Sequence, residues 1–168
     1  SEADIEEYLY AYSDKQTGLV VKCFVTCYND FNAVEYVLRF VNTSSQNTPI
    51  IENTAVINQS FSYSQSGTFI LHHSLGSNAA VNDFQPFDEQ MQIGKDIYMT
   101  PIGGRSSDNT AFPFFNIESP AQQGIVVAVG WTGKWYADVL QKDEKSVSLK
   151  SGMENMHLTL YPKEEIRT

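Results

Sequence analysis

The sequence predicts an all-β fold, a large antiparallel β-sandwich of two packed sheets. Three observations predict it. Apolar and polar residues alternate in many short runs, turn residues separate the runs about every eight to twelve residues, and no stretch keeps the 3.6-residue spacing of an amphipathic helix for three turns. About ten strands exceed what one small barrel needs. The 168 residues can bury a core of their own, so we predict a single sandwich domain over residues 1–168.

The first half of the chain supplies the first strands. Tyr8, Tyr10 and Tyr12 recur with a period of two, and the turn residues of SDKQTG join them to a second strand over residues 19–28, so the two strands form a hairpin. After the turn NDFN, the alternation in AVEYVLRFV predicts a third strand. The polar run NTSSQNTP interrupts the pattern, and strands resume in IIENTAVINQSFSY and TFILHH.

The second half supplies six more strands and two irregular segments. The strands are predicted at residues 96–100, 113–118, 124–131, 135–140, 146–150 and 156–161. The irregular segments, residues 74–94 and 102–112, show little periodicity, and the first is far longer than an ordinary loop. A loop of that length is either functional or packed against a neighbour.

Apolar residues that alternate with polar neighbours identify the predicted core. The residues expected to be buried are Val21, Cys23, Val25, Leu38, Phe40, Ile70, Val127 and Val129. Cys23 and Cys27 lie in one strand, where four extended residues span about 13 Å, which is too far for a disulfide. We therefore expect two free, buried thiols, and they leave the redox compartment undecided.

Composition argues against two classes of partner. The chain has 11 Lys and Arg residues against 20 Asp and Glu residues, and its net charge of -9 would repel a phosphate backbone, so we expect no nucleic-acid partner. No apolar run approaches the roughly 20 residues of a membrane-spanning helix, so we expect no membrane partner.

His72 and His73 end an apolar strand. Because adjacent strand residues point to opposite faces, the two imidazoles cannot bind one metal ion from a regular strand. We predict no metal site and no cofactor. The two histidines either cap an edge of the core or contact a ligand at the rim of a sheet.

The segment GGRSSDN combines two glycines with Arg105, Ser106, Ser107 and Asp108. The glycines allow close backbone approach and the guanidinium can bind a carboxylate, but neither of the usual phosphate-binding loop motifs is present. Two interpretations stay open. The segment contacts a ligand, or Arg105 anchors it to Asp83 or Asp88 of the long irregular segment.

WTGKW places Trp131 and Trp135 at the two ends of a tight turn. Such a pair can stack on sugar rings, or the two indoles can pack on each other across the strands. Signatures of nucleophilic hydrolases and zinc peptidases, such as GxSxG and HExxH, are missing from the sequence. Glycosidase chemistry needs two carboxylates that flank a bond, and the 20 Asp and Glu residues supply too many candidates for the sequence to choose between them.

Long stretches of the sequence resemble a known family. PIGGRSS, FPFFNIESPAQQGIVVAVGWTGKWYADV and GMENMHLTLYPKEEIRT, together with TGLVVKCFVTCYNDFNAVEYVLRFVNTSSQNTPIIEN and FILHHSLGSNAAVNDFQP, cover nearly the whole chain. They resemble the N-terminal domain of α-galactosidase-like proteins of glycoside hydrolase family 36. This resemblance implies a super-sandwich related to galactose mutarotase, followed by a (β/α)8 barrel that carries the catalytic aspartates. It agrees with the sandwich predicted from the alternation.

The resemblance also implies what the chain would do. Residues 162–168 would begin the linker to the barrel, so no residue of this chain would be catalytic. The chain alone would be inactive, and it would pack on the barrel and help to wall its sugar cleft. His72, His73, Asp83 and Arg105 to Asp108 are then candidates to face the substrate or the barrel. Galactosides or oligosaccharides are the implied ligands, and a homo-oligomer would form through the parent enzyme. The compartment stays open, although an acidic polysaccharide-processing protein with free thiols would suit a bacterial periplasm or cytoplasm.

Two alternatives are kept. A freestanding carbohydrate-binding module or lectin would use Trp131, Trp135 and rim tyrosines as a stacking platform. A mutarotase-like enzyme would need a histidine and a carboxylate facing each other across a sugar-sized cleft. In the leading interpretation, the irregular segments and exposed Phe84, Phe87 or Phe112 form the apolar patch that meets the barrel.

Overall fold

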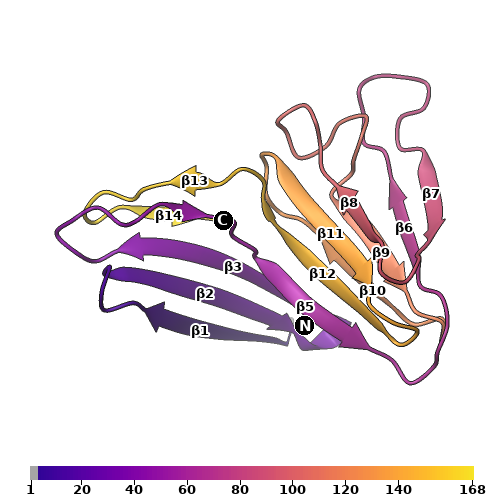
Figure 1. Cartoon of the computed structure of the whole chain (residues 1–168), viewed down its shortest axis with the longest axis horizontal. Coiled ribbons are helices and arrows are strands. Elements are labelled where there is room, and N and C mark those ends of the chain that lie inside the picture. The colour runs from indigo at the N-terminus through magenta and orange to yellow at the C-terminus, as the bar shows by residue number, and fades with distance from the viewer. Residues whose placement is uncertain (1–3) are drawn as a thin grey trace. The chain divides into compact units, whose positions relative to one another are not determined.

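The computed structural model describes residues 4–168, and these fold into two compact units (Figure 1). One unit combines the chain up to Val56 with residues 155–168, and the other is residues 57–154. We call them the terminal unit and the central unit. Every strand pairing among the described residues is antiparallel.

The terminal unit contains one four-stranded sheet and one strand pair. The sheet has the order β1-β2-β3-β14, with β1 at Ile5–Ser13, β2 at Leu19–Tyr28, β3 at Ala33–Asn42 and β14 at Glu165–Arg167. The pair joins β4, Ile51–Glu52, to β13, His157–Leu158. A single 3₁₀ turn, η1 at Asn29–Phe31, links β2 to β3, and Asn32 ends it in the left-handed conformation that Asn tolerates.

The register of the terminal sheet explains the three tyrosines. Tyr8 lies opposite Val25, Tyr10 opposite Cys23, and Tyr12 opposite Val21. Side chains opposite each other share a face, so the tyrosines continue the apolar face of β2. Cys23 and Cys27 are free thiols, as predicted, but they are half-buried rather than buried.

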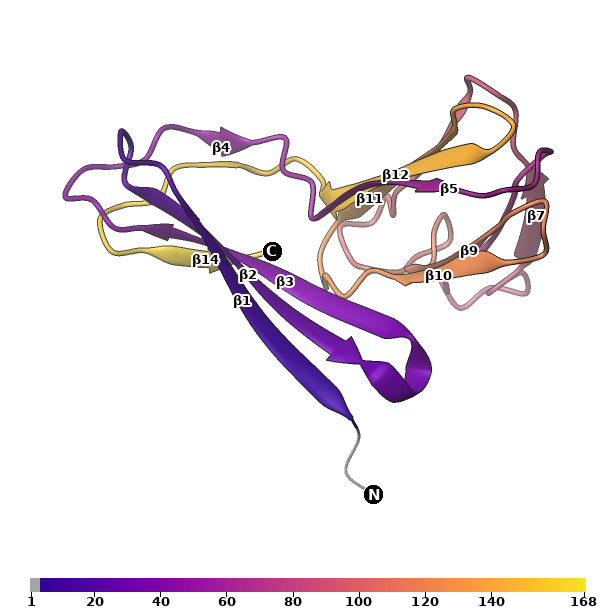
Figure 2. The same ribbon diagram turned by 90° about the horizontal axis from the view of Figure 1, so that it is seen from below.

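The central unit is a sandwich of two four-stranded sheets that lie face to face (Figure 2). One sheet has the order β10-β9-β6-β7, formed by Gly124–Ala128, Phe114–Glu118, Ile70–Ser74 and Pro86–Gln90. The other has the order β5-β12-β11-β8, formed by Ile57–Ser62, Ser146–Met153, Trp135–Gln141 and Asp96–Met99.

Both sheets contribute to one buried core. Phe69, Leu71 and Ile117 from the side of the first sheet pack with Trp135, Val139 and Leu149 from the second. Each of these six side chains is at most 1% exposed. The all-β sandwich predicted from alternation is therefore confirmed.

The core prediction is confirmed in part. Phe40 and Val127 are buried, whereas Val21, Cys23, Val25, Leu38, Ile70 and Val129 are half-buried. Four of these residues, Val21, Cys23, Val25 and Leu38, lie on β2 and β3. They remain partly exposed to solvent because other side chains cover only part of their face of the sheet.

Two strands are absent from the sequence prediction. β7 lies inside the segment 74–94, and β14 lies inside residues 162–168, where the start of a linker is expected. The single-domain assignment over residues 1–168 stays a prediction.

Candidate functional site

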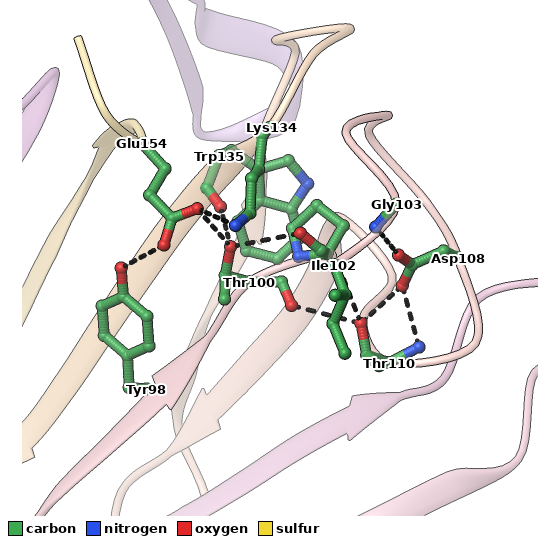
Figure 3. A network of polar contacts seen from close by, with 10 residues as sticks. Tyr98, Thr100, Ile102, Gly103, Asp108, Thr110, Lys134, Trp135 and Glu154 are labelled. Atoms are coloured by element: carbon green, nitrogen blue, oxygen red, sulfur yellow. Dashed lines mark hydrogen bonds and ion pairs between the residues drawn. The ribbon is translucent and has the colours of Figure 1, made fainter. Parts of the chain in front are cut away.

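The candidate residues gather around the two irregular segments of the central unit, and a polar network holds the second of these segments (Figure 3). Asp108 is 3% exposed, and its carboxylate accepts hydrogen bonds from the backbone N–H of Gly103 at 2.5 Å and of Thr110 at 2.9 Å. Burial by itself raises the pKa of Asp108, but the hydrogen bonds from Thr110 and Gly103 outweigh it and hold the pKa below its usual value. The carboxylate therefore stays ionised and folds its own loop.

Trp135, in the buried core, also holds the loop that contains Asp108. Its side chain is fully buried, and its indole Nε1 donates a hydrogen bond of 2.6 Å to the Ser106 carbonyl. Ser106 in turn donates its N–H to the Thr132 carbonyl at 3.1 Å. The ring of Trp135 has no exposed face on which a sugar could stack, which disagrees with the sugar-stacking interpretation of this residue. Trp131 is half-buried at the edge of the core, and a stacking role there stays a prediction.

Asp83 organises the first irregular segment in a similar way. It accepts hydrogen bonds from the Ser77 hydroxyl at 2.5 Å and from the backbone N–H of Asn78 and Ala80. These bonds, that from Ser77 first, lower the pKa of the Asp83 carboxyl. The turn that Asp83 closes carries Phe84 in the left-handed conformation, with φ of 58°. A bulky side chain in this region is unusual, and the surrounding contacts must hold it there.

The two irregular segments are joined directly. Arg105 Nη2 donates to the side-chain oxygen of Asn78 at 3.3 Å, so the expected anchor to Asp83 or Asp88 is wrong. Asp83 already serves its own turn, and Asp88 binds a histidine. The segments also touch at Gly76, where an added Cβ would overlap the Ser107 hydroxyl and the Asp108 carbonyl.

The two adjacent histidines serve opposite faces of β6, as predicted. His72 lies between two carboxylates, with Nδ1 at 2.7 Å from Asp88 and Nε2 at 2.8 Å from Glu118. The hydrogen bond to Asp88, followed by that to Glu118, raises the pKa of His72. His73 stacks on Phe87 with ring centroids 5.3 Å apart. Its Nε2 is buried and makes no hydrogen bond, but it lies 3.4 Å from the Glu89 carboxylate. Among residues 4–168 no cluster of His, Cys, Asp or Glu is arranged to hold a metal ion.

Three phenylalanines form a row beside these segments. The rings of Phe84 and Phe112 meet edge to face at 5.6 Å, and those of Phe112 and Phe114 lie 5.3 Å apart. Phe84 and Phe114 are 54% and 52% exposed, and Val81 at the tip of the first segment is fully exposed. We call Phe84, Phe112 and Phe114 the aromatic row. It contains two of the three phenylalanines expected in an apolar patch, and the third, Phe87, lies against His73.

A hollow of about 560 Å³ opens at one edge of the central sandwich, between the edge strands β7 and β8. It is lined by His73, Glu89, Asp96, Ile97, Tyr98, Met99, Thr100, Ile102 and Thr110. Tyr98 donates its hydroxyl to Glu154, which also pairs with Lys134 at 2.6 Å. Burial and the bond to Glu154 raise the pKa of Tyr98 to about 12, so this phenol stays protonated. Sequence reasoning missed the hollow because no local motif joins β7 to β8.

No family profile matches this sequence, and no curated protein is similar to it in sequence. Similarity to solved structures is clear. The chain matches the galactosidase domain of the α-galactosidase-sucrose kinase AgaSK with a TM-score of 0.79 and 15% identity, over 98% of this chain and 23% of that one. This chain has the fold found in α-galactosidases.

Two further matches agree. An α-galactosidase from Lactobacillus brevis gives a TM-score of 0.82 at 13% identity over 100% of this chain. The GH36 α-galactosidase AgaA from Geobacillus stearothermophilus gives 0.80 at 15% identity over 98% of it. The chain covers only 22% and 23% of these two proteins. It therefore corresponds to one region of much longer enzymes, and the resemblance seen in the sequence is confirmed at the level of the fold.

Proposed function

We propose that this chain is the non-catalytic N-terminal domain of an α-galactosidase-like glycoside hydrolase, where it packs on the catalytic barrel and helps to wall the sugar-binding cleft. The observation that carries the proposal is the aromatic row, which sits on the two irregular segments. Exposed apolar groups of this size on a firmly held loop are typical of a surface that another part of a protein covers. The 22–23% coverage of the matched enzymes supports a partner in the same polypeptide.

The loop chemistry supports a rigid wall rather than a flexible flap. Asp83 and Asp108 each accept several hydrogen bonds within their own segment, and Arg105 connects the two segments through Asn78. Groups that contact a substrate must be held in place by their supporting residues. In this arrangement Arg105, Ser106 and Ser107 lie on a prearranged surface, whereas Asp108 is used inside it.

Hydrolysis by the chain alone is not expected. A retaining glycosidase needs two carboxylates about 5 Å apart in a shaped cleft. In the candidate site, Asp83 and Asp108 are engaged by their own loops, and Asp88 and Glu118 are engaged by His72. The catalytic pair is proposed to lie in the barrel.

The test compares this chain with the protein encoded by the complete open reading frame. Phe84→Ser and Arg105→Ala are made in both, with Ile93→Ser as the control because Ile93 is 56% exposed near a turn and makes no ring contact with the aromatic row. We expect Phe84→Ser to leave the isolated chain as stable as before. In the longer protein it should lower stability and raise KM for α-galactosides several-fold. Equal destabilisation of both forms would place Phe84 in the domain's own core and refute the interface.

The hollow supports a second candidate function, carbohydrate binding by this domain itself. Glu89 and Asp96 can accept hydrogen bonds from sugar hydroxyls, and Tyr98 offers a half-exposed ring that stacks on Tyr136 at 6.0 Å. Titration of the isolated chain with galactose and raffinose, followed by NMR shifts of β8 amides, tests this function. Saturable shifts that the double variant E89Q/D96N abolishes would support it, and unshifted spectra at about 50 mM sugar would exclude useful affinity.

A further inference from the structure

Strand β1 is an uncovered edge of the terminal sheet. It pairs with β2 on one side only, and all nine of its residues, Ile5–Ser13, are exposed (Figure 1). Its other side presents a row of backbone N–H and C=O groups for which no second strand exists within the described chain. Such a row is a template for strand addition.

This edge differs from every other sheet edge in residues 4–168. The other edge strands of the three four-stranded sheets are three to six residues long: β14, β8, β7, β10 and β5. β7 also begins with a proline, while β10 begins with a glycine. β1 has no proline, lysine, glycine or bulge along its nine paired residues. Glu6 and Glu7 are its only charged residues, so its length and the absence of a proline or bulge leave most of this edge open to pairing.

The faces beside the edge are apolar. Tyr8, Tyr10 and Tyr12 are 46%, 50% and 67% exposed on one face, and Leu9 is 58% exposed on the other. On the tyrosine face the partners on β2 are apolar as well. An added strand would extend this face and cover part of the tyrosine rings.

We propose that two copies of this chain associate by antiparallel pairing of β1 with β1, about a two-fold axis that passes through Leu9. This register is the one that pairs all nine residues of the strand. The opposed pairs are Ile5 with Ser13, Glu6 with Tyr12, Glu7 with Ala11, Tyr8 with Tyr10, and Leu9 with Leu9 of the second copy. An antiparallel strand is self-complementary about such an axis, so the contact closes after two copies.

Charge supports this register over those shifted toward the N-terminal end of the strand. Glu6 and Glu7 each face an uncharged residue when the axis lies at Leu9. An axis at Glu6 or Glu7 would place two carboxylates opposite each other, which is unfavourable. The Leu9 register also opposes Tyr8 and Tyr10, and such aromatic pairs across strands are favourable. A second copy of this chain in the Leu9 register therefore pairs all nine residues of the edge and places no two carboxylates directly opposite each other.

The area involved is small, so the dimer is weak. One strand edge with its flanking side chains falls at the low end of specific interfaces. We expect a dissociation constant of roughly 10–100 µM. The proposal does not depend on the function proposed above, because it is tested on this chain without any sugar.

The first experiment is sedimentation equilibrium of the chain from about 1 to 300 µM. We expect a reversible monomer–dimer equilibrium in the wild-type chain. L9K and L9E should each be monomeric, because like charges then meet at the axis, whereas their equimolar mixture should form a heterodimer. Phe31→Lys is the control, since Phe31 is 75% exposed outside β1 and should leave the dimer unchanged. A chain that is monomeric at 300 µM, or a dimer that L9K does not weaken at least tenfold, overturns the proposal.

The second experiment tests the register by disulfide trapping in a background with Cys23 and Cys27 changed to Ala. L9C alone should form a disulfide-linked dimer, because residues directly opposite in an antiparallel pair have Cα atoms close enough for a disulfide. A11C alone should not cross-link, but a mixture of E7C and A11C should. Cross-linking of A11C to itself with none at L9C would refute the Leu9 axis.

Discussion

The central and terminal units contain the same kind of strand but bury it differently. β11 alternates fully buried and half-buried residues along its length, while β1, which alternates in sequence almost as regularly, is exposed throughout. The central strands face a second sheet and share one core with it. Alternation therefore specifies the faces of a strand, and burial of the apolar face depends on whether a second layer lies against it.

The largest expected effect tests this contrast at one aromatic residue in each unit. Trp135→Ala should lower the free energy of unfolding by about 3–5 kcal/mol, because it leaves a large cavity and an unpaired Ser106 carbonyl. Tyr12→Ala should cost less than about 0.5 kcal/mol, since its side chain is mostly in water. Urea unfolding at low micromolar concentration, followed by circular dichroism, measures both. Comparable losses would show that the terminal sheet is as well packed as the sandwich.

A smaller loss of stability is expected in the loop at residues 102–112, where a buried carboxylate accepts the backbone hydrogen bonds that a neighbouring strand would otherwise accept. Asp108→Ala removes the acceptor for the N–H groups of Gly103 and Thr110, and should cost about 1–3 kcal/mol. Amide exchange in residues 102–112 should accelerate at the same time. Asn109→Ala is the matched control, because Asn109 is adjacent but exposed. If both variants exchange alike, Asp108 does not hold the loop.

A still smaller effect is expected from pH. The contribution of His72 to the free energy of unfolding should change by less than about 1 kcal/mol as this residue titrates. The pKa of His72 is raised in the folded state, so its contribution is complete below the ordinary histidine pKa near 6.5 and is lost as pH rises through the higher folded value. Exposure of His72 and Asp88 reduces the size of this effect. His72→Gln should remove the fall in stability that begins above the ordinary histidine pKa, and His157→Gln in the terminal unit is the comparison. An unchanged profile in the His72 variant would contradict the assignment.

The smallest effect is expected at the contact between the two irregular segments. Arg105→Ala removes one exposed hydrogen bond of 3.3 Å and should change global stability by less than about 0.5 kcal/mol. Exchange of the amides in residues 76–84 should nevertheless become faster. Lys95→Ala, an exposed change at a distant turn, should leave that exchange as it is. Unaltered exchange in the Arg105 variant would mean that the backbone contacts alone hold the segments.

Most strands could be predicted because their signal is local. The bounds of β2 match the prediction, since its apolar residues alternate between two turns. β7 was hidden because its sequence PFDEQ carries a proline and two acidic residues, and it forms a strand only because β6 lies beside it. β14 could not be predicted from the sequence either. Three residues carry no periodicity, and pairing of Ile166 with Phe40 supplies the strand.

The candidate site was less accessible to sequence reasoning. GGRSSDN correctly marked an irregular loop, but the sequence did not predict that Asp108 binds the backbone of this loop. The choice of Asn78 rather than an acid as the partner of Arg105 depends on where two turns end in space. Trp135 could not be distinguished from a rim residue because WTGKW looks the same whether its second indole points outward or into the core. His72 was placed correctly on its own face, while its two acidic neighbours come from strands β7 and β9.

The contact at Gly76 has a consequence for how this domain can vary. Because the backbone there lies against Ser107 and Asp108, the two irregular segments occupy one shared space. A residue inserted in one segment would displace the other, so viable changes in length or shape should occur in both together. Related domains with different ligands or partners should therefore differ at residues 74–94 and 102–112 as a linked pair, and transfer of either segment alone into another scaffold should fail where transfer of both succeeds.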